Sequence, residues 1–335
     1  MKKSRSRIAL GLLAVALSSS AWPAAIGLVP APSRIDFVVD APRHVLYISG
    51  TDQLLRYDLK AGAFLAPIAL SGQTLGMDIS PDGHFLAVAN GITDAARSHV
   101  DIIDLRTLLP KRLYFTLEFM EGGTYTVAYD RDGRLLVSSQ FEGSGWVPLR
   151  KVNVKRSQAT TIGSVMRDSM LTPSADHTWI AIAESNNSGG PYGRYATGDA
   201  SYASTYGTGW FNYEIGISRD GNQMAVPTYG GTYFNDFRTS FPPLGQYAGV
   251  QPVGVAYSPA RDRVYFPFAQ TNYIAEYDTT TMTETRRWTV PSTFGTNGNW
   301  AFVSGRTKVS TDDKTLCTTV TGGVWCTKLG ATAAP

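Results

Sequence analysis

The sequence predicts an all-β fold: a seven-bladed β-propeller of four-stranded antiparallel blades, with the ring closed by an N-terminal strand. One phrase, an apolar strand, a polar turn and a second apolar strand, recurs seven times along the 335 residues. Its copies start 40 to 52 residues apart, which is the size of one propeller blade. No amphipathic stretch of helical length follows residue 20, so we expect almost no helix. The copies begin at Asp40, Ser80, Asp130, Ser174, Ser218, Ser258 and Ser310.

Each copy accounts for four strands in turn. The first strand leads into the polar turn, where Gly and Asp tolerate a positive φ. The second strand is nearly continuous in apolar residues, as at 85–88, and is expected to be covered on both faces. A third strand of mixed polarity follows, as at 100–104, and a more polar fourth strand ends the unit, as at 285–289. The Asp-Gly turns lie at Asp82-Gly83, Asp132-Gly133 and Asp220-Gly221.

The seventh copy lacks a fourth strand, because only Gly-Ala-Thr-Ala-Ala-Pro follows the apolar run at 324–329. An apolar segment at 25–29 precedes the inner strand of the first copy, which begins near Ile35. Four antiparallel strands bury little by themselves, and a closed ring gives every blade two neighbours. We therefore expect residues 25–29 to supply the missing outer strand and to close the ring.

Residues 1–21 are expected to form a cleaved signal peptide, and residues 22–335 a single propeller domain. A basic start precedes a ten-residue apolar stretch at 8–17 that is too short to span a bilayer. The sequence thus predicts a periplasmic or secreted protein. The leader holds four of the 30 Lys and Arg residues, so 26 remain against 27 acidic residues. This near-neutral balance argues against a nucleic-acid partner, and no membrane span is expected.

The two cysteines, Cys317 and Cys326, flank a predicted hairpin with Thr321 and Gly322 at its tip. Counting outward from this turn places the cysteines opposite each other, in a position where paired side chains lie close together. This geometry predicts a disulfide, as expected in an oxidising compartment. Two free buried thiols are the alternative.

The phrases at 80–90 and 251–259 resemble those of YVTN-type and lactonase-like bacterial propellers. The first reads Ser-Pro-Asp-Gly-His-Phe-Leu-Ala-Val-Ala-Asn and the second Gln-Pro-Val-Gly-Val-Ala-Tyr-Ser-Pro. The resemblance covers residues 33–329, and TolB-type and amine-dehydrogenase-like propellers share the turn phrase. Because this broad group includes scaffolds, ligand binders, lactonases, lyases and quinone-dependent dehydrogenases, the resemblance implies a fold and leaves the activity open.

A column of residues four positions before each repeat start is expected to line the channel mouth. It holds Asp36, Gly76, Thr126, Met170, Glu214, Gly254 and Arg306. If this column faces the axis, its three ionisable members gather around one polar cavity, where they could bind a polar ligand or act as acid and base. Glu184 is a further candidate acid or base. The alternative is a water-filled channel whose charges satisfy one another.

Long loops in the fourth and fifth copies, at 185–212 and 229–237, alternate aromatic residues with Gly, Ser and Asn. Loops of this length are usually functional, and Tyr and Trp supply rigid contact area with a polar edge. The alternative is that part of the segment at 185–212 forms the outer strands of the fourth blade, with Tyr195, Tyr202 and Tyr206 packed between blades. The candidate ligand-binding residues are Trp146, Tyr192, Tyr195, Trp210, Asn212, Tyr213, Tyr229, Tyr233 and Trp300.

Signals for a cofactor or a metal ion are missing from the sequence. His44, His84 and His177 fall in turns and are expected to be exposed, on the face opposite the usual binding face. No haem-attachment motif or phosphate loop occurs. Two hypotheses remain. One is a binding or scaffold module that holds a small-molecule, carbohydrate or protein ligand at the aromatic loops. The other is a lactone hydrolase or a polysaccharide or glycoside lyase that uses the acidic residues and Arg306.

Overall fold

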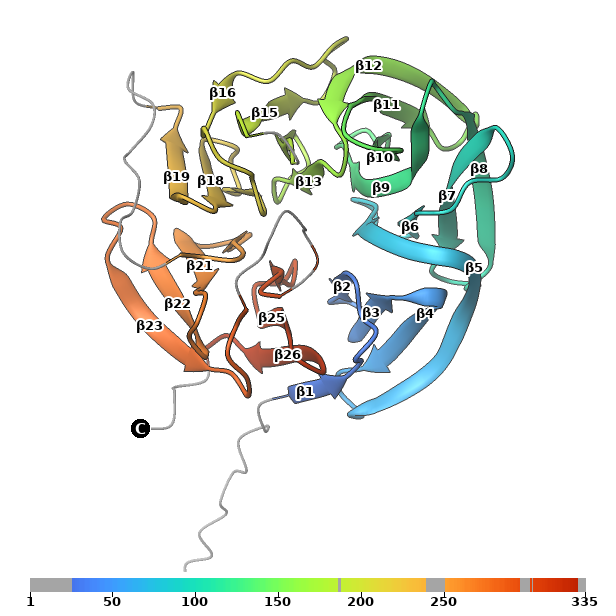
Figure 1. Cartoon of the computed structure of the whole chain (residues 1–335). Helices are drawn as coiled ribbons and strands as arrows, with labels where there is room; N and C mark the ends of the chain where they lie inside the picture. The colour runs from blue at the N-terminus through green and yellow to red at the C-terminus, as the bar shows by residue number, and fades with distance from the viewer. Residues whose placement is uncertain (1–25, 186–187, 239–250, 296–301, 303, 331–335) are drawn as a thin grey trace, which may run out of the picture.

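The computed structural model describes residues 26–185, 188–238, 251–295, 302 and 304–330. Every regular element in these ranges is a β-strand, and neighbouring strands of each sheet pair antiparallel. The sheets follow one another around a common centre (Figure 1), and within each sheet except the last the strands are arranged in sequence order. Within the part of the chain that is described, no helix is long and apolar enough to cross a membrane.

The largest sheet has seven strands, because two four-stranded units share one long strand, β5. The first part of β5 pairs with β4, and its last residues pair with β6. The same strand is therefore the outer strand of one set and the inner strand of the next. The strands are β2 (Phe37–Asp40), β3 (Val45–Ser49), β4 (Thr51–Asp58), β5 (Ala63–Ile79), β6 (Phe85–Asn90), β7 (Arg97–Asp104) and β8 (Pro110–Thr116).

Four more sheets lead toward the C-terminus. The first is a four-stranded sheet of β9 (Glu121–Tyr129), β10 (Leu135–Phe141), β11 (Trp146–Asn153) and β12 (Gln158–Met166). The second is a four-stranded sheet of β13 (Met170–Pro173), β14 (Trp179–Ala183), β15 (Pro191–Ala196) and β16 (Tyr206–Gly207). A three-stranded sheet follows, with β17 (Gly216–Ile217), β18 (Gln223–Thr228) and β19 (Gly231–Asp236). The next has β20 (Ala256–Tyr257), β21 (Arg263–Pro267), β22 (Tyr273–Asp278) and β23 (Glu284–Thr289).

The last sheet joins the two ends of the described chain. Its order is β1-β26-β25-β24, and Leu28 of β1 lies opposite Trp325 of β26. The N-terminal strand thus takes the outer position beside the C-terminal hairpin. The bounds are β1 (Gly27–Pro30), β24 (Thr307–Val309), β25 (Thr315–Val320) and β26 (Gly323–Lys328).

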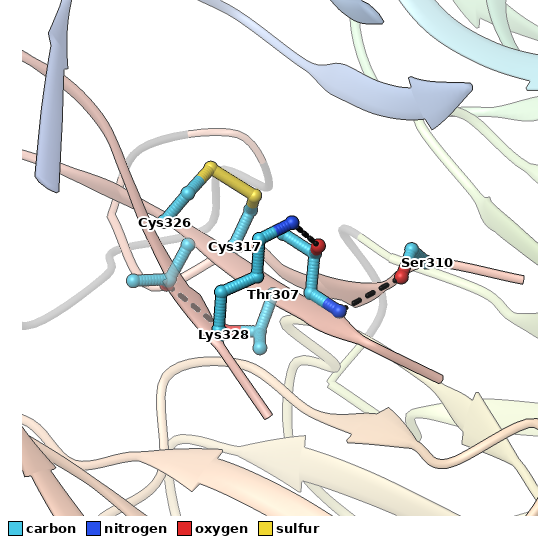
Figure 2. Close-up of a disulfide and its surroundings, with 7 residues drawn as sticks. Thr307, Ser310, Cys317, Cys326 and Lys328 are labelled. Atoms are coloured by element: carbon cyan, nitrogen blue, oxygen red, sulfur yellow. Dashed lines mark hydrogen bonds between the residues drawn. A yellow bond between two sulfur atoms is a disulfide. The ribbon is translucent and has the colours of Figure 1, made fainter. Parts of the chain in front are cut away.

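The predicted disulfide is confirmed. Cys317 and Cys326 lie opposite each other on β25 and β26 and are bonded (Figure 2). Their Cα atoms are 4.1 Å apart, the close spacing of opposed residues that do not exchange hydrogen bonds. The hairpin register counted from the sequence is also correct, with Thr318 opposite Trp325 and Val320 opposite Gly323.

The core lies between neighbouring sheets. Leu136 of β10 and Ile180 of β14 are buried in one such layer, while β3 and β6 contribute Tyr47 and Leu86 to another. All five residues of β3 are buried, as predicted for middle strands. Burial of each large apolar side chain in this way contributes about 1.5–3 kcal/mol to the free energy of unfolding. The sheets therefore stabilise one another face to face.

Several turns after the inner strands contain a residue with a positive φ, which explains their composition. Gly83, Gly133 and Gly221 have φ of 69–72°, while His44 and His177 both have φ of 56°. Glycine adopts this region without steric cost, whereas histidine is one of the residues enriched there among the others. His177 therefore occupies the position that glycine fills in other copies, three residues after the repeat start, whereas His44 lies one residue later in its copy.

Candidate functional site

The structure brings together three side chains of the predicted axial column. Asp36 precedes β2, Glu214 precedes β17 and Arg306 precedes β24. The Arg306 guanidinium donates from Nε to Asp36 Oδ1 at 2.6 Å and from a terminal nitrogen to Glu214 Oε2. Lys308 adds a bond from Nζ to Asp36 Oδ2 at 3.1 Å. We call these four residues the axial network; they join strands that are distant in sequence.

Opposite charges dominate the electrostatics of the axial network. Burial opposes the charge of Asp36, but Arg306 and Lys308 outweigh it and hold the pKa of Asp36 below its usual range. Burial likewise opposes the charge of Arg306, and Asp36 and Glu214 keep its pKa above the usual range. For Glu214 burial is the stronger influence, so its pKa is raised despite Arg306. The network is consequently a buried ion-pair cluster whose members satisfy one another.

Three members of the axial network line a cavity of about 620 Å³. The lining includes Glu214, Arg306 and Lys308, and it continues along the inner strands to the turns that follow them, near Ser80 and Ser174. Phe302, which does not line the cavity, covers Arg306, with 5.1 Å between the guanidinium carbon and the ring centroid. The cavity therefore extends toward the turns.

The sequence pattern did not identify two of the cavity residues. His177 was expected to be an exposed turn residue, yet it is half-buried and lines the cavity. Asp78 also lines it and accepts hydrogen bonds from the backbone nitrogens of Tyr129, at 2.7 Å, and Ile79, at 2.9 Å. Burial raises the pKa of Asp78. Asp78 and Lys308 lie two residues beyond Gly76 and Arg306 of the predicted column. Because side chains alternate along a strand, residues two positions apart point to the same side, and this spacing could have identified both residues from the sequence.

Glu184 lies apart from the axial network. Its side chain is fully buried after β14, and neither carboxylate oxygen has a hydrogen-bond partner among the described residues. Burial raises its pKa to about 7, although the Met166 backbone and the Ser204 hydroxyl lie near enough to oppose the shift. Below this pH the neutral carboxyl is the favoured form. Glu184 does not line the cavity that Glu214 and Arg306 line.

Two of the predicted loop aromatics form an exposed pair. Trp210 and Tyr229 are 41% and 64% exposed, and their ring centroids are 5.8 Å apart. Gly230 permits the contact, because a Cβ there would lie 2.3 Å from the indole nitrogen of Trp210. We call Trp210 and Tyr229 the aromatic platform. Trp146, 53% exposed, is a third accessible aromatic from a different sheet.

Buried polar contacts hold the aromatic platform in place. Asn212 donates from Nδ2 to the backbone oxygens of Glu184, at 2.9 Å, and Pro191, at 3.0 Å. Thr208 donates from Oγ1 to Asn212 Oδ1 at 3.0 Å and accepts from the Trp210 backbone nitrogen at 3.2 Å. Asn212 is thus a buried support of the loop and not a surface contact residue.

The other aromatic candidates lie elsewhere. Tyr192, Tyr195 and Tyr213 are buried, and Tyr233 is half-buried. Residues 191–196 and 206–207 form β15 and β16, so the long segment supplies outer strands of its sheet, and Tyr195 and Tyr202 pack in the core. Trp300 falls outside the described residues. Of the candidates, Trp146, Trp210 and Tyr229 present most surface to solvent.

No group of three or more His, Cys, Asp or Glu side chains within the described ranges is arranged to hold a metal ion.

Comparison with known proteins shows the fold and no family. No family model and no curated protein matches the chain. A chain in a crystal structure of a mitotic checkpoint complex is similar with a TM-score of 0.65 and 14% identity, over 97% of this chain and 99% of that one. A chain of Kuenenia stuttgartiensis hydrazine synthase is similar with a TM-score of 0.66 and 12% identity, over 94% and 99%. These likenesses support a β-propeller fold.

Proposed function

We propose that this chain is a secreted or periplasmic β-propeller that binds a ligand at the face formed by its long loops. The ligand classes that fit are a small molecule, a carbohydrate or a protein. The aromatic platform carries the proposal, because Trp210 and Tyr229 are exposed side by side while a buried network fixes the loop beneath them. Rigid, exposed aromatic residues on a preorganised support are typical of binding hot spots.

The alternative of a lactone hydrolase or lyase has weaker support. Asp36 and Glu214 both accept hydrogen bonds from Arg306, so each is already paired with a buried cation, and Asp36 does not line the cavity. A general acid or base needs a free position toward its substrate. Glu184 lacks partners among the described residues, but it is sealed in the core.

The aromatic platform can be tested by substitution. Wild-type protein would be immobilised and used to capture components of the envelope fraction of its source organism, with protease and periodate treatment separating protein from carbohydrate ligands. We expect Trp210→Ala to lower recovery of the captured component at least tenfold, because a hot-spot aromatic contributes about 2 kcal/mol or more. Phe119→Ala is the matched control, since Phe119 is 87% exposed and outside the platform. Equal recovery by the Trp210 and Phe119 variants would contradict the proposal.

We further infer seven blades in a ring that β1 closes. The seven copies of the turn phrase support this number, and the β1–β26 pairing supports the closure. The turn phrase also favours a place among the YVTN-type and lactonase-like propellers.

Deleting residues 22–32 should lower the Tm by about 10 °C or more, since it exposes the edge of β26 and removes buried Val29. An unchanged Tm in a scanning calorimeter would refute the closure.

A further inference from the structure

The axial cavity is a built site that the proposed function does not use. Its volume of about 620 Å³ falls in the range of small-molecule pockets. Neither member of the aromatic platform lines it. Apolar side chains from four inner strands or their flanking residues provide much of the wall, namely Val127, Leu171, Ile217 and Val255.

His177 presents an acceptor to this cavity. Its Nδ1 lies 2.8 Å from the backbone oxygen of Tyr129. A carbonyl oxygen only accepts, so Nδ1 must carry the hydrogen of the ring. In the neutral imidazole Nε2 is then unprotonated and accepts hydrogen bonds. The backbone contact therefore fixes the tautomer of a cavity residue.

Asp78 and Lys308 add an acceptor and a donor. Each Asp78 oxygen accepts one backbone N–H, which leaves capacity for a second bond at each oxygen. The Lys308 ammonium donates to Asp36 and, at 3.5 Å, to the backbone oxygen of Met77. One of its three hydrogens is left among the described contacts, and the side chain is 23% exposed.

The charges along the cavity have mixed sign, which disfavours ions as ligands. An anion near Lys308 would also meet Asp78 and Glu214, and a cation near Asp78 would also meet Lys308 and Arg306. Like charges at such range are repulsive in a partly desolvated site. A hydroxyl group has no net charge and can both donate and accept.

We propose that the axial cavity binds a neutral polyhydroxylated small molecule of about monosaccharide size. Asp78 and His177 accept from its hydroxyl groups, Lys308 donates to one of them, and the apolar walls contact its carbon–hydrogen face. This site is distinct from the aromatic platform and does not depend on it.

The ligand class can be tested with matched probes. Calorimetry and ligand-observed NMR would compare glucose, galactose, mannose and myo-inositol with glucosamine, galactosamine and glucuronate. At least one neutral probe should bind roughly tenfold more tightly than the charged ones, because each charged probe meets a like charge. Binding of a charged probe as tight as that of the best neutral probe, or no binding of any neutral probe, would overturn the proposal.

The location can be tested with two histidines of equal backbone geometry. His177→Asn should lower the affinity for the neutral probe roughly five- to tenfold, which is the effect of one lost hydrogen bond. His44→Asn is the control, since His44 has the same φ of 56° but does not line the cavity. Lys308→Met provides a second cavity variant in which Asp36 keeps Arg306. Equal affinities in all three variants would overturn the assignment, whereas Trp210→Ala should leave this binding unchanged and so separates it from the platform.

Discussion

Two buried carboxylates in different regions of this molecule have opposite surroundings. Asp36, in the axial network, and Glu184, behind β14, have side chains that are both fully buried. Asp36 contacts two cations, Arg306 and Lys308. Glu184 contacts none within salt-bridge distance among the described residues, and its oxygens lack hydrogen-bond partners there. Burial acts to raise the pKa of both carboxyls. For Asp36, Arg306 and Lys308 outweigh this influence and hold the pKa low, whereas for Glu184 burial prevails and the pKa is raised.

Position in the fold explains the difference. The inner strands of separate sheets converge at the axis, so charges from distant parts of the sequence can meet there. Glu184 lies at the end of a middle strand, near the backbone of Met166 and the hydroxyl-bearing Tyr202 and Ser204. At the axis Asp36 is stabilised as a carboxylate by pairing with cations, whereas behind β14 the carboxyl group of Glu184 is stabilised in its protonated form.

The largest effect is expected from removing the shared cation of the axial network. Arg306→Met would leave Asp36 and Glu214 buried with Lys308 as their only described cation, and we expect a loss of about 3–5 kcal/mol in the free energy of unfolding. Urea denaturation followed by tryptophan fluorescence measures it. Arg97→Met is the control, because Arg97 pairs with Asp94 at 2.8 Å on the surface and should cost about 1 kcal/mol or less. Similar losses in both variants would remove the contrast between buried and exposed pairs.

The sequence predicted much of this architecture because turns and strands are local features. The Asp-Gly turns, the apolar middle strands and the hairpin of Cys317 and Cys326 all depend on neighbours in the chain. The axial column was also predictable, since repeats of similar spacing place equivalent residues at equivalent positions. This is why the repeat pattern alone groups Asp36, Glu214 and Arg306.

The remaining features depend on packing between segments that no local pattern records. Tyr192 and Tyr195 have the composition of a binding loop, but they are buried because the same segment must supply β15. In the sequence His177 resembles the other turn histidines. Its hydrogen bond to the Tyr129 backbone and its place in the cavity lining depend on a strand that is distant in sequence. The contact of the Phe302 ring with Arg306 was likewise unpredictable, because Phe302 lies outside the repeated turn phrase.

A smaller effect, visible only as a function of pH, is expected at Glu184. Its pKa of about 7 lies above the ordinary value of 4.5, so between these values the folded protein keeps a proton that the unfolded chain has lost. The stabilisation by the protonated form is thus complete below pH 4.5 and lost as the pH rises to 7. The loss should amount to about 2–3 kcal/mol. Glu184→Gln, neutral at every pH, should remove this part of the slope and be more stable than wild type at pH 8.

Glu142→Gln is the matched control for this slope, because Glu142 is exposed and its replacement should leave the pH dependence as in wild type. Urea unfolding at a series of pH values from 4 to 8 separates the two variants. If Glu184→Gln kept the wild-type slope, Glu184 would have to be ionised when buried, and a cation outside the described residues would have to pair with it. The two regions would then follow the same rule, with every buried carboxylate stabilised by an opposite charge.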